Sequence, residues 1–329
     1  MADLPRYVET RGNAVLRQPL ALQNCTMYSF FLHADADALT EFCDATFNRP
    51  CGHAVEYRVL GPLVMAVCAD TLRVRSLDPE HAKWGWGPER DYSFWVPLVD
   101  TRSRRLRWFL PYVFVDSGAA CVGGRETYGF FKQTGTLTLS PSRDDPAELA
   151  VDTLLVDQAG PQAHAITTRL YTIRRVGGGP LASLEAAWHS AEGAVETLVK
   201  AEGVRLAEVF AKTLWYGPRI LLDLFEGFLR RSVPMVLLKQ FRDAAHAQLA
   251  SQQQVVEASS VLEAWHGGGL LPEYELAIHA CDSHPLVADL GLRVDHQAAN
   301  GDHIVRPELA FWNRIDFRLD PGNVVWSAR

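Results

Sequence analysis

The sequence lacks an excess of positive charge, and it lacks any long apolar run. Its 329 residues contain 32 lysines and arginines against 39 aspartates and glutamates, which gives a formal net charge of −7. A chain without a basic field does not hold phosphate backbones by charge, so we expect no nucleic-acid partner. No stretch reaches the roughly 18 uncharged apolar residues of a membrane span, and the first thirty residues lack the apolar core of a signal peptide. We therefore expect a soluble, cytoplasmic protein with no membrane partner.

Recognisable metal and cofactor motifs are absent as well. The six cysteines are scattered without a Cys-x-x-Cys pair, which favours reduced and mostly buried thiols. His279, Cys281 and His284 fall close together, but no second ligand pair follows at a zinc-site spacing. The glycines at 177–179 lack the lysine-containing frame of a phosphate-binding loop, and neither GxSxG nor HExxH occurs. We expect neither a metal ion nor an organic cofactor.

Short β-branched and aromatic runs separated by turn residues make up most of the chain. Thr26–Leu32 is typical of a strand, and residues 36–47 show helical spacing after a cap at Asp35 or Asp37. Helices do not alternate with the strands, so the pattern predicts an α+β protein built on an antiparallel sheet or barrel. The further strands predicted are Glu56–Leu60, Leu63–Ala69, Tyr92–Val99, Leu106–Val115, Gly135–Leu139, Pro234–Phe241, Ala247–Trp265, Glu273–His279, Phe311–Leu319 and Val324–Trp326.

A helical pattern interrupts the strands at residues 181–231. Helices are predicted at Leu181–Ala201, Val204–Leu214 and Pro218–Arg231, with an apolar stripe along them. One helical insertion inside a single domain of residues 1–329 is the simplest organisation. The stripe could cover the mouth of the barrel, form a subunit interface, or pack in the ordinary way on the sheet. We expect the protein to form a homo-oligomer.

Residues 113–137, VFVDSGAACVGGRETYGFFKQTGTL, place one lysine among aromatic side chains. Lys132 follows Tyr128, Phe130 and Phe131 after an apolar strand and a glycine-rich turn. Burial disfavours the charged ammonium, so a lysine in an apolar pocket can carry a free amine near neutral pH and attack a carbonyl carbon. The alternative is a lysine whose stem packs on the rings while its amine reaches solvent.

The run GGRETYGFFKQTG resembles the signature of the acetoacetate decarboxylase family, in which Gly-Arg-Glu, a small residue, an aromatic residue, proline and a Schiff-base lysine follow in this order. Phe131 replaces the proline. The segments CTMYSFFLHADADALTEFC, FLPYVFVD, VPMVLLKQF and QQVVEASSVLEAWHGG are similar to strands and an early helix of the family. This resemblance implies an antiparallel β-cone or barrel. The matching signature positions are Gly124, Arg125, Glu126, Gly129, Phe130 and Lys132.

Two positions depart from the family's pattern. The decarboxylases place a glutamate two positions after the residue matched by Tyr92, and Phe94 stands there. They also carry an arginine for the substrate carboxylate on the early strand, and Cys25 stands there. Residues 89–91, Glu-Arg-Asp, lie nearby, so a shifted alignment could restore one of these roles. As aligned, the site is more apolar than a decarboxylase site, which disfavours a strongly anionic substrate.

The resemblance implies that Lys132 forms a Schiff base with a small-molecule keto or aldehyde substrate. Gln133 stands where the decarboxylases have a second lysine, so activation of the amine would come mainly from burial. An imine stabilises a carbanion on the adjacent carbon, and decarboxylation, aldol or retro-aldol chemistry or dehydration could follow. The alternative is a non-catalytic member that binds a small molecule.

The remaining expectations concern the residues around the lysine. Tyr92, Tyr128 and Glu126 are candidate proton handlers, although Glu126 could instead form a structural ion pair with Arg125. The residues expected to line the substrate pocket or handle protons are Tyr92, Phe94, Arg125, Glu126, Tyr128, Phe130 and Phe131.

Overall fold

A computed structural model describes residues 4–9, 15–178, 187–194, 196–197 and 232–328 of the chain. Strands dominate this part of the chain, and the helices in it are few and short. None of these helices is long and apolar enough to cross a membrane. The architecture is α+β, as the sequence predicts.

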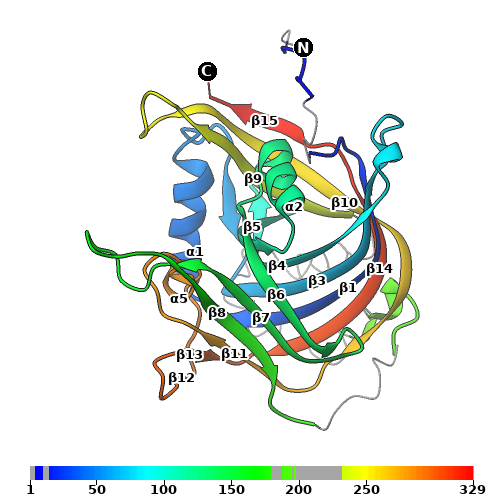
Figure 1. The fold of residues 1–329 in the computed structure, drawn as a ribbon, viewed down its shortest axis with the longest axis vertical. Helices are drawn as coiled ribbons and strands as arrows, with labels where there is room; N and C mark the ends of the chain where they lie inside the picture. Colours follow the sequence, from blue (N-terminus) through cyan, green and yellow to red (C-terminus); the bar gives the residue numbers. More distant parts are fainter. Residues whose placement is uncertain (1–3, 10–14, 179–186, 195, 198–231, 329) are drawn as a thin grey trace.

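Seven strands pair edge to edge into a closed ring (Figure 1). Neighbouring strands are antiparallel except β5 and β9, which run parallel and meet at Trp108 and Met235. Because every strand of the ring has a partner on both sides, the sheet closes into a barrel with an enclosed interior. In ring order the strands are β1 (Leu20–His33), β3 (Leu63–Ser76), β4 (Gly87–Asp100), β5 (Arg105–Val115), β9 (Ser232–Arg242), β10 (Ala250–Leu270) and β14 (Leu309–Leu319).

A second sheet continues from the barrel at β5. Its first strand, β6, runs parallel to β5, and the remaining strands follow in antiparallel order. Figure 1 shows β6, β7 and β8 running side by side. Short strands β2 (Tyr57–Val59) and β15 (Asn323–Ser327) add to β4 and β10. The strands of the second sheet, in order, are β6 (Lys132–Ser142), β7 (Asp145–Leu155), β8 (Ile166–Arg175), β11 (Tyr274–Ile278), β13 (His303–Val305) and β12 (His296–Gln297).

Strand alternation divides the apolar side chains between two cores. Successive side chains of a strand point to opposite faces. On β1, Tyr28 and Phe30 enter the core between the barrel and the second sheet, whereas Met27 and Phe31 belong to the barrel interior. Ring contacts join the two sheets, since Phe30 meets Tyr274 with ring centroids 5.2 Å apart. The second sheet therefore supports the outside of the barrel, and Lys132 at the start of β6 also reaches the barrel interior.

Helix α1 (Ala36–Cys43) forms where the sequence predicts a helix. The carboxylate of Asp35 accepts hydrogen bonds from the backbone N–H groups of Asp37 and Ala38, which settles the choice of cap. A π-helical turn, η1 (Asp44–Asn48), extends α1.

Two long strands were missed from the sequence, and one prediction falls largely outside the described residues. Strands β7 and β8 were not predicted, because charged and polar residues on their partly exposed face interrupt the apolar pattern. Most of the helical insertion predicted at 181–231 lies outside the described residues. At its start Trp188 is buried and its ring lies 6.0 Å from that of Phe311 on β14.

We expect Gly129→Ala to destabilise the fold. Gly129 has a φ of +90°, and a Cβ there would lie 2.5 Å from the backbone nitrogen and Cα of Lys239 on β9. The left-handed backbone and the clash together should lower the free energy of unfolding by at least about 2 kcal/mol, measured by denaturant titration. The control is Gly160→Ala, because a Cβ at that exposed position meets open space. Equal stability of the two variants would contradict this account.

Candidate active site

A short helix between β5 and β6 sets the position of Lys132. Helix α2 (Gly118–Gly123) begins after Ser117, whose hydroxyl accepts a hydrogen bond from the backbone N–H of Ala120, and a π-helical turn, η3 (Gly124–Tyr128), continues it. The sequence predicts a turn here, and the structure corrects this to a helix. Glycines and alanines hide it, because they carry no apolar stripe. Gly129 then ends the helix in the left-handed conformation, and Lys132 opens β6 beside Val113 of β5.

The backbone and stem of Lys132 are held by this helix. The Arg125 guanidinium donates a hydrogen bond of 3.0 Å to the carbonyl oxygen of Lys132. A Cβ built on Gly124 would lie 2.6 Å from the lysine Cδ and 3.0 Å from its Cε. The Gly-Arg of the signature therefore has a local physical role: the glycine leaves room for the lysine stem, and the arginine fixes its backbone.

Two carboxylates of β4 hold the amine at the end of that stem. Lys132 is 9% exposed, and its Nζ lies 2.7 Å from a carboxylate oxygen of Glu89 and 3.4 Å from one of Asp91. The Phe130 ring centroid lies 5.6 Å from the same nitrogen. Ammonium, carboxylates and ring thus form a compact group in which a positive charge on the lysine is paired.

This pairing reverses the expected direction of the lysine's pKa. Burial by itself lowers the pKa of the Lys132 ammonium, but the charges and hydrogen bonds of Glu89 and Asp91 outweigh it and raise the pKa above its ordinary value of 10.5. The expectation that burial would free the amine is therefore wrong for the resting site. Burial also raises the pKa of Asp91 above its ordinary value of 3.8, although Lys132 opposes that change.

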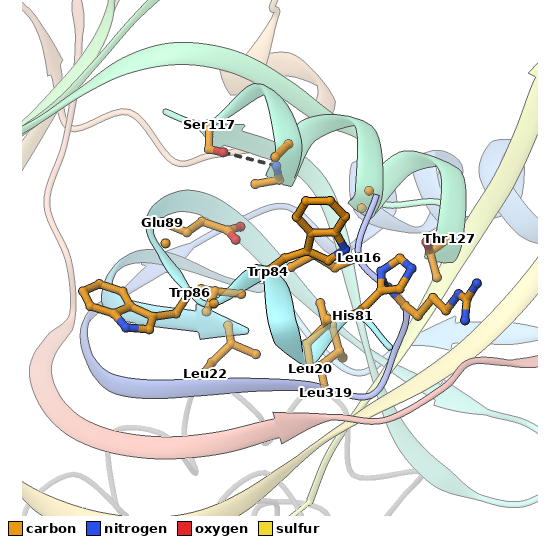
Figure 2. Close-up of a pocket in the computed structure, with 18 of the residues that line it drawn as sticks. Leu16, Leu20, Leu22, His81, Trp84, Trp86, Glu89, Ser117, Thr127 and Leu319 are labelled. Carbon is orange, nitrogen blue, oxygen red and sulfur yellow. Dashed lines mark hydrogen bonds between the residues drawn. The ribbon is translucent and has the colours of Figure 1, made fainter. Parts of the chain in front are cut away.

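An outer cleft leads to Lys132 from the surface. Its volume is about 900 Å³, and it lies between helix α2 and the strand ends that carry Leu20, Leu22 and Leu319 (Figure 2). The side chains of Trp84 and Glu89 face this cleft between the helix and the strand ends. Trp84 is 72% exposed, so its indole offers apolar surface at the opening. The cleft is wide enough to admit a small organic molecule to the amine.

An inner chamber continues on the other side of Lys132, inside the barrel. Its volume is about 150 Å³, and all seven barrel strands contribute to its wall. Lys132, Glu89 and Phe130 line both cavities and so form the boundary between them. Among the described residues of the chamber wall, Lys132 alone carries a positive charge. Most of the wall is apolar, and it includes Met27, Met65, Val67, Trp95, Trp108, Leu110, Met235, Leu262, Ile315 and Phe317.

Tyr92 and Phe94 lie on the opposite face of β4 from the amine, which corrects their expected role. The Tyr92 hydroxyl donates a hydrogen bond to the carbonyl oxygen of Thr138, and the Phe94 ring packs edge-on against Tyr171 in the outer core. Because side chains alternate along a strand, shifting the alignment by an odd number of residues exchanges the two faces. The carboxylates at the amine come from Glu89 and Asp91, and the charged run beside Tyr92 was the signal for them.

The other expected residues divide between the two sides of the signature segment. Phe130 lines both cavities, and Tyr128 lines the outer cleft while its hydroxyl donates to the carbonyl oxygen of Asp320. Phe131 points away from the amine, toward Phe109 and the outer core. The negative charge of Glu126 acts on the ammonium of Lys239 and raises its pKa against the effect of burial. Arg125 donates its hydrogen bond to the backbone carbonyl of Lys132. Phe130 and Tyr128 therefore remain candidates for contact with a ligand.

Cys25 does not replace the missing arginine. It is fully buried, and burial raises the pKa of its thiol to about 12, so the thiol is neutral at physiological pH. Arg143 acts on Cys25 through its charge and lowers the pKa of the thiol slightly against the effect of burial, but its guanidinium is paired with Asp70 at 3.3 Å. The chamber therefore offers little to balance an anionic substrate group.

The histidine-rich segment forms hydrogen bonds within the protein. His279 contacts Asp157 and Asp302, and His284 lies 2.9 Å from the side-chain oxygen of Gln133. In the part of the chain that the structure describes, no three histidine, cysteine or acidic side chains gather as a metal site would require.

Solved structures share this arrangement of strands. Acetoacetate decarboxylase from Legionella pneumophila superposes with a TM-score of 0.61 at 14% identity, over 99% of this chain and 93% of the other. A second acetoacetate decarboxylase structure gives a TM-score of 0.58 at 15% identity, over 95% and 92% of the two chains. The chain has the acetoacetate decarboxylase fold. No family model and no curated protein matches the sequence, so this is a divergent form of the fold.

We expect Glu89→Gln to shift the reactivity of Lys132 to lower pH. The amine reacts only as the free base, so a raised pKa makes its acylation rate climb through the alkaline range. Removing the negative charge of Glu89 should shift the pH dependence of the acylation rate to lower pH by about 1 to 3 units. The measurement is the rate of acetic anhydride modification of Lys132 between pH 7 and 11, read by peptide mass mapping. Glu80→Gln removes a carboxylate of the same cleft that pairs with Arg17, and it should leave the profile unchanged.

We expect Gly124→Ala to displace the lysine stem. The new methyl group would occupy the space of Cδ, so Nζ must leave its 2.7 Å contact with Glu89. The acetic anhydride modification of Lys132 should then be faster at a given pH, because the amine loses a carboxylate partner that raises its pKa. Gly118→Ala is the matched control in the same helix, where an added Cβ meets open space. Equal rates for the two variants would show that the stem adapts.

Proposed function

We propose that this protein is a lyase-type enzyme that forms a Schiff base between Lys132 and an uncharged ketone or aldehyde. The observation that carries the proposal is the position of the amine, which lies where the outer cleft meets the inner chamber and contacts two carboxylates. A carbonyl compound entering the cleft can place its reacting carbon at the amine and its apolar body in the chamber.

The carboxylates give the ammonium proton a place to go. Asp91, whose pKa burial raises, accepts the proton as the carbonyl group arrives, and the free amine attacks the carbonyl carbon. As the C–N bond forms, one N–H proton moves to the former carbonyl oxygen and gives a neutral carbinolamine. Its hydroxyl group then takes the proton of the Asp91 carboxylic acid, and the C–O bond breaks to release water. The product is an iminium ion on Lys132, and Asp91 is again a carboxylate.

The raised pKa of Lys132 is compatible with this chemistry. An iminium ion carries the positive charge at the place where the ammonium carried it. The fixed charges of Glu89 and Asp91 therefore stabilise the reactive intermediate as they stabilise the resting ammonium. The cost of deprotonating the resting lysine is recovered when the cation forms again.

The charges of the site favour one group of reactions after imine formation. A keto acid would bring its carboxylate beside Glu89 and Asp91, and of the described chamber residues only Lys132 could balance it. Retro-aldol cleavage or dehydration of a neutral hydroxycarbonyl compound needs no such balance. We therefore place these reactions ahead of decarboxylation.

Reductive trapping tests the Schiff base. Cyanoborohydride with neutral ketones and aldehydes should leave an adduct that peptide mapping assigns to Lys132, and Lys132→Met should abolish it. Lys83→Met is the control, because Lys83 lines the same cleft and is exposed. Adducts spread equally over Lys83 and Lys132 would contradict the proposal. Faster release of carbon dioxide from 3-keto acids than cleavage of neutral hydroxyketones would reverse the order of reactions.

The ion-paired resting state favours a second candidate, a small-molecule-binding protein without catalysis. A lysine held as ammonium can donate a hydrogen bond to a carbonyl oxygen and stop there. Trp95 and Trp108 line the chamber and report on its contents by fluorescence. Saturable quenching by a ketone together with no trapped adduct on Lys132 would identify this function instead.

A further inference from the structure

Asn313 on β14 is a buried amide without a hydrogen-bond partner. Its exposed fraction is 1%, and both its side-chain nitrogen and its side-chain oxygen are buried and unpaired. Among the described residues that line the inner chamber, Asn313 is the only one with a buried side-chain nitrogen or oxygen that lacks a hydrogen-bond partner. Neither the signature around Lys132 nor the proposed proton transfer uses it.

The strand places this amide in the chamber wall. Asn313 lies opposite Met27 of β1 and Gly268 of β10, and it follows Trp312, which belongs to the outer core. Alternation along β14 therefore sends Asn313 to the chamber face with Ile315 and Phe317. Most of the chamber wall is apolar, and neither polar atom of the amide has a hydrogen-bond partner.

An unpaired amide in such a wall costs free energy that an apolar side chain would not. Buried polar groups in native proteins are nearly always hydrogen-bonded, and an exception calls for a ligand, a water molecule or a functional reason. Another polar group of the chamber wall has a partner: the Ser93 hydroxyl accepts a hydrogen bond of 2.8 Å from the Trp95 indole. Asn313, in contrast, has an unpaired donor, its side-chain nitrogen, and an unpaired acceptor, its side-chain oxygen.

The size of the chamber limits what could pair with the amide. A cavity of about 150 Å³ holds a molecule of benzene size, on the order of six to eight non-hydrogen atoms. The amine and the amide line this one space, and Lys132 stands at its boundary with the outer cleft. One small ligand can therefore present a carbonyl group to the amine and extend into the chamber toward the amide.

We infer that Asn313 is a specificity residue that hydrogen-bonds an uncharged oxygen or amide group on the part of the substrate remote from its carbonyl. The inference rests on the proposed function and names its substrate class: a ketone or aldehyde with a short apolar chain that carries an ether, hydroxyl or amide group. A charged group is disfavoured there, since Asn313 is neutral and its neighbours are apolar. The amide selects among carbonyl compounds, and Lys132 performs the chemistry.

Matched probe pairs test this inference. The pairs are 5-methoxy-2-pentanone with 2-heptanone and 6-methoxy-2-hexanone with 2-octanone, which differ by one ether oxygen in place of a methylene group. The half-saturating concentration for cyanoborohydride trapping on Lys132 should be about five to ten times lower for at least one ether than for its alkyl partner. Asn313→Leu should remove or reverse this preference while the trapping rate at saturation is kept.

Controls separate recognition from a structural role. Met27→Leu alters the chamber beside Asn313 without changing its polar groups, so it should affect both members of a pair alike. Asn313→Leu should not lower the melting temperature, because it removes an unpaired buried amide. A lowered melting temperature without a change in preference would mean that the amide serves the fold through a bound water, and it would overturn the inference.

The outcomes distinguish the two proposals. Trapping on Lys132 without any ether preference would leave the Schiff base standing and reject the role of Asn313. If no probe is trapped, the Schiff base fails, and quenching of Trp95 and Trp108 fluorescence by the same pairs still decides the inference. An ether preference in quenching that Asn313→Leu removes would support it as a binding specificity, and its absence would reject it.

Discussion

A lysine ammonium buried between two carboxylates is the interaction on which this site depends. Glu89 and Asp91 lie on one strand and Lys132 opens another, so the pair exists only because the barrel brings β4 and β6 to the same place. Removing one partner of a buried pair leaves an uncompensated charge, which typically costs about 3–5 kcal/mol. The same attraction sets the charge of the resting site, because both carboxylates favour a cation on the lysine nitrogen.

The closed ring of strands makes that interaction possible. Alternation along each strand sends one set of side chains to the outer core and the other set to the chamber, and the second sheet seals the outer core. A lysine at the boundary of such a chamber is shielded from water on one side and reached from the cleft on the other. Shielding strengthens the carboxylate contacts, and access lets a ligand compete for the amine.

Most of the strands were predictable from local patterns, whereas the partners of the amine were not. The strands around Thr26–Leu32 and Leu106–Val115 and the capped helix after Asp35 follow from side-chain periodicity and capping chemistry. The choice between Glu89 and Phe94 depended on an alignment, and an odd shift in register exchanges the two faces of β4. Helix α2 was missed because glycine and alanine give no amphipathic signal, although the helix carries the signature glycine against the lysine stem.

The sequence by itself determined an α+β fold of acetoacetate decarboxylase type and singled out Lys132 as the residue to test. It did so because strand alternation and the Gly-Arg-Glu signature are local features. Only the tertiary structure decided the charge state of that lysine. Burial and neighbouring carboxylates act on the pKa of a lysine in opposite directions. Which effect prevails depends on the distance between Lys132 and Glu89, which lie on different strands and 43 residues apart in the chain. The unpaired amide of Asn313 is likewise visible only once the barrel has closed around it.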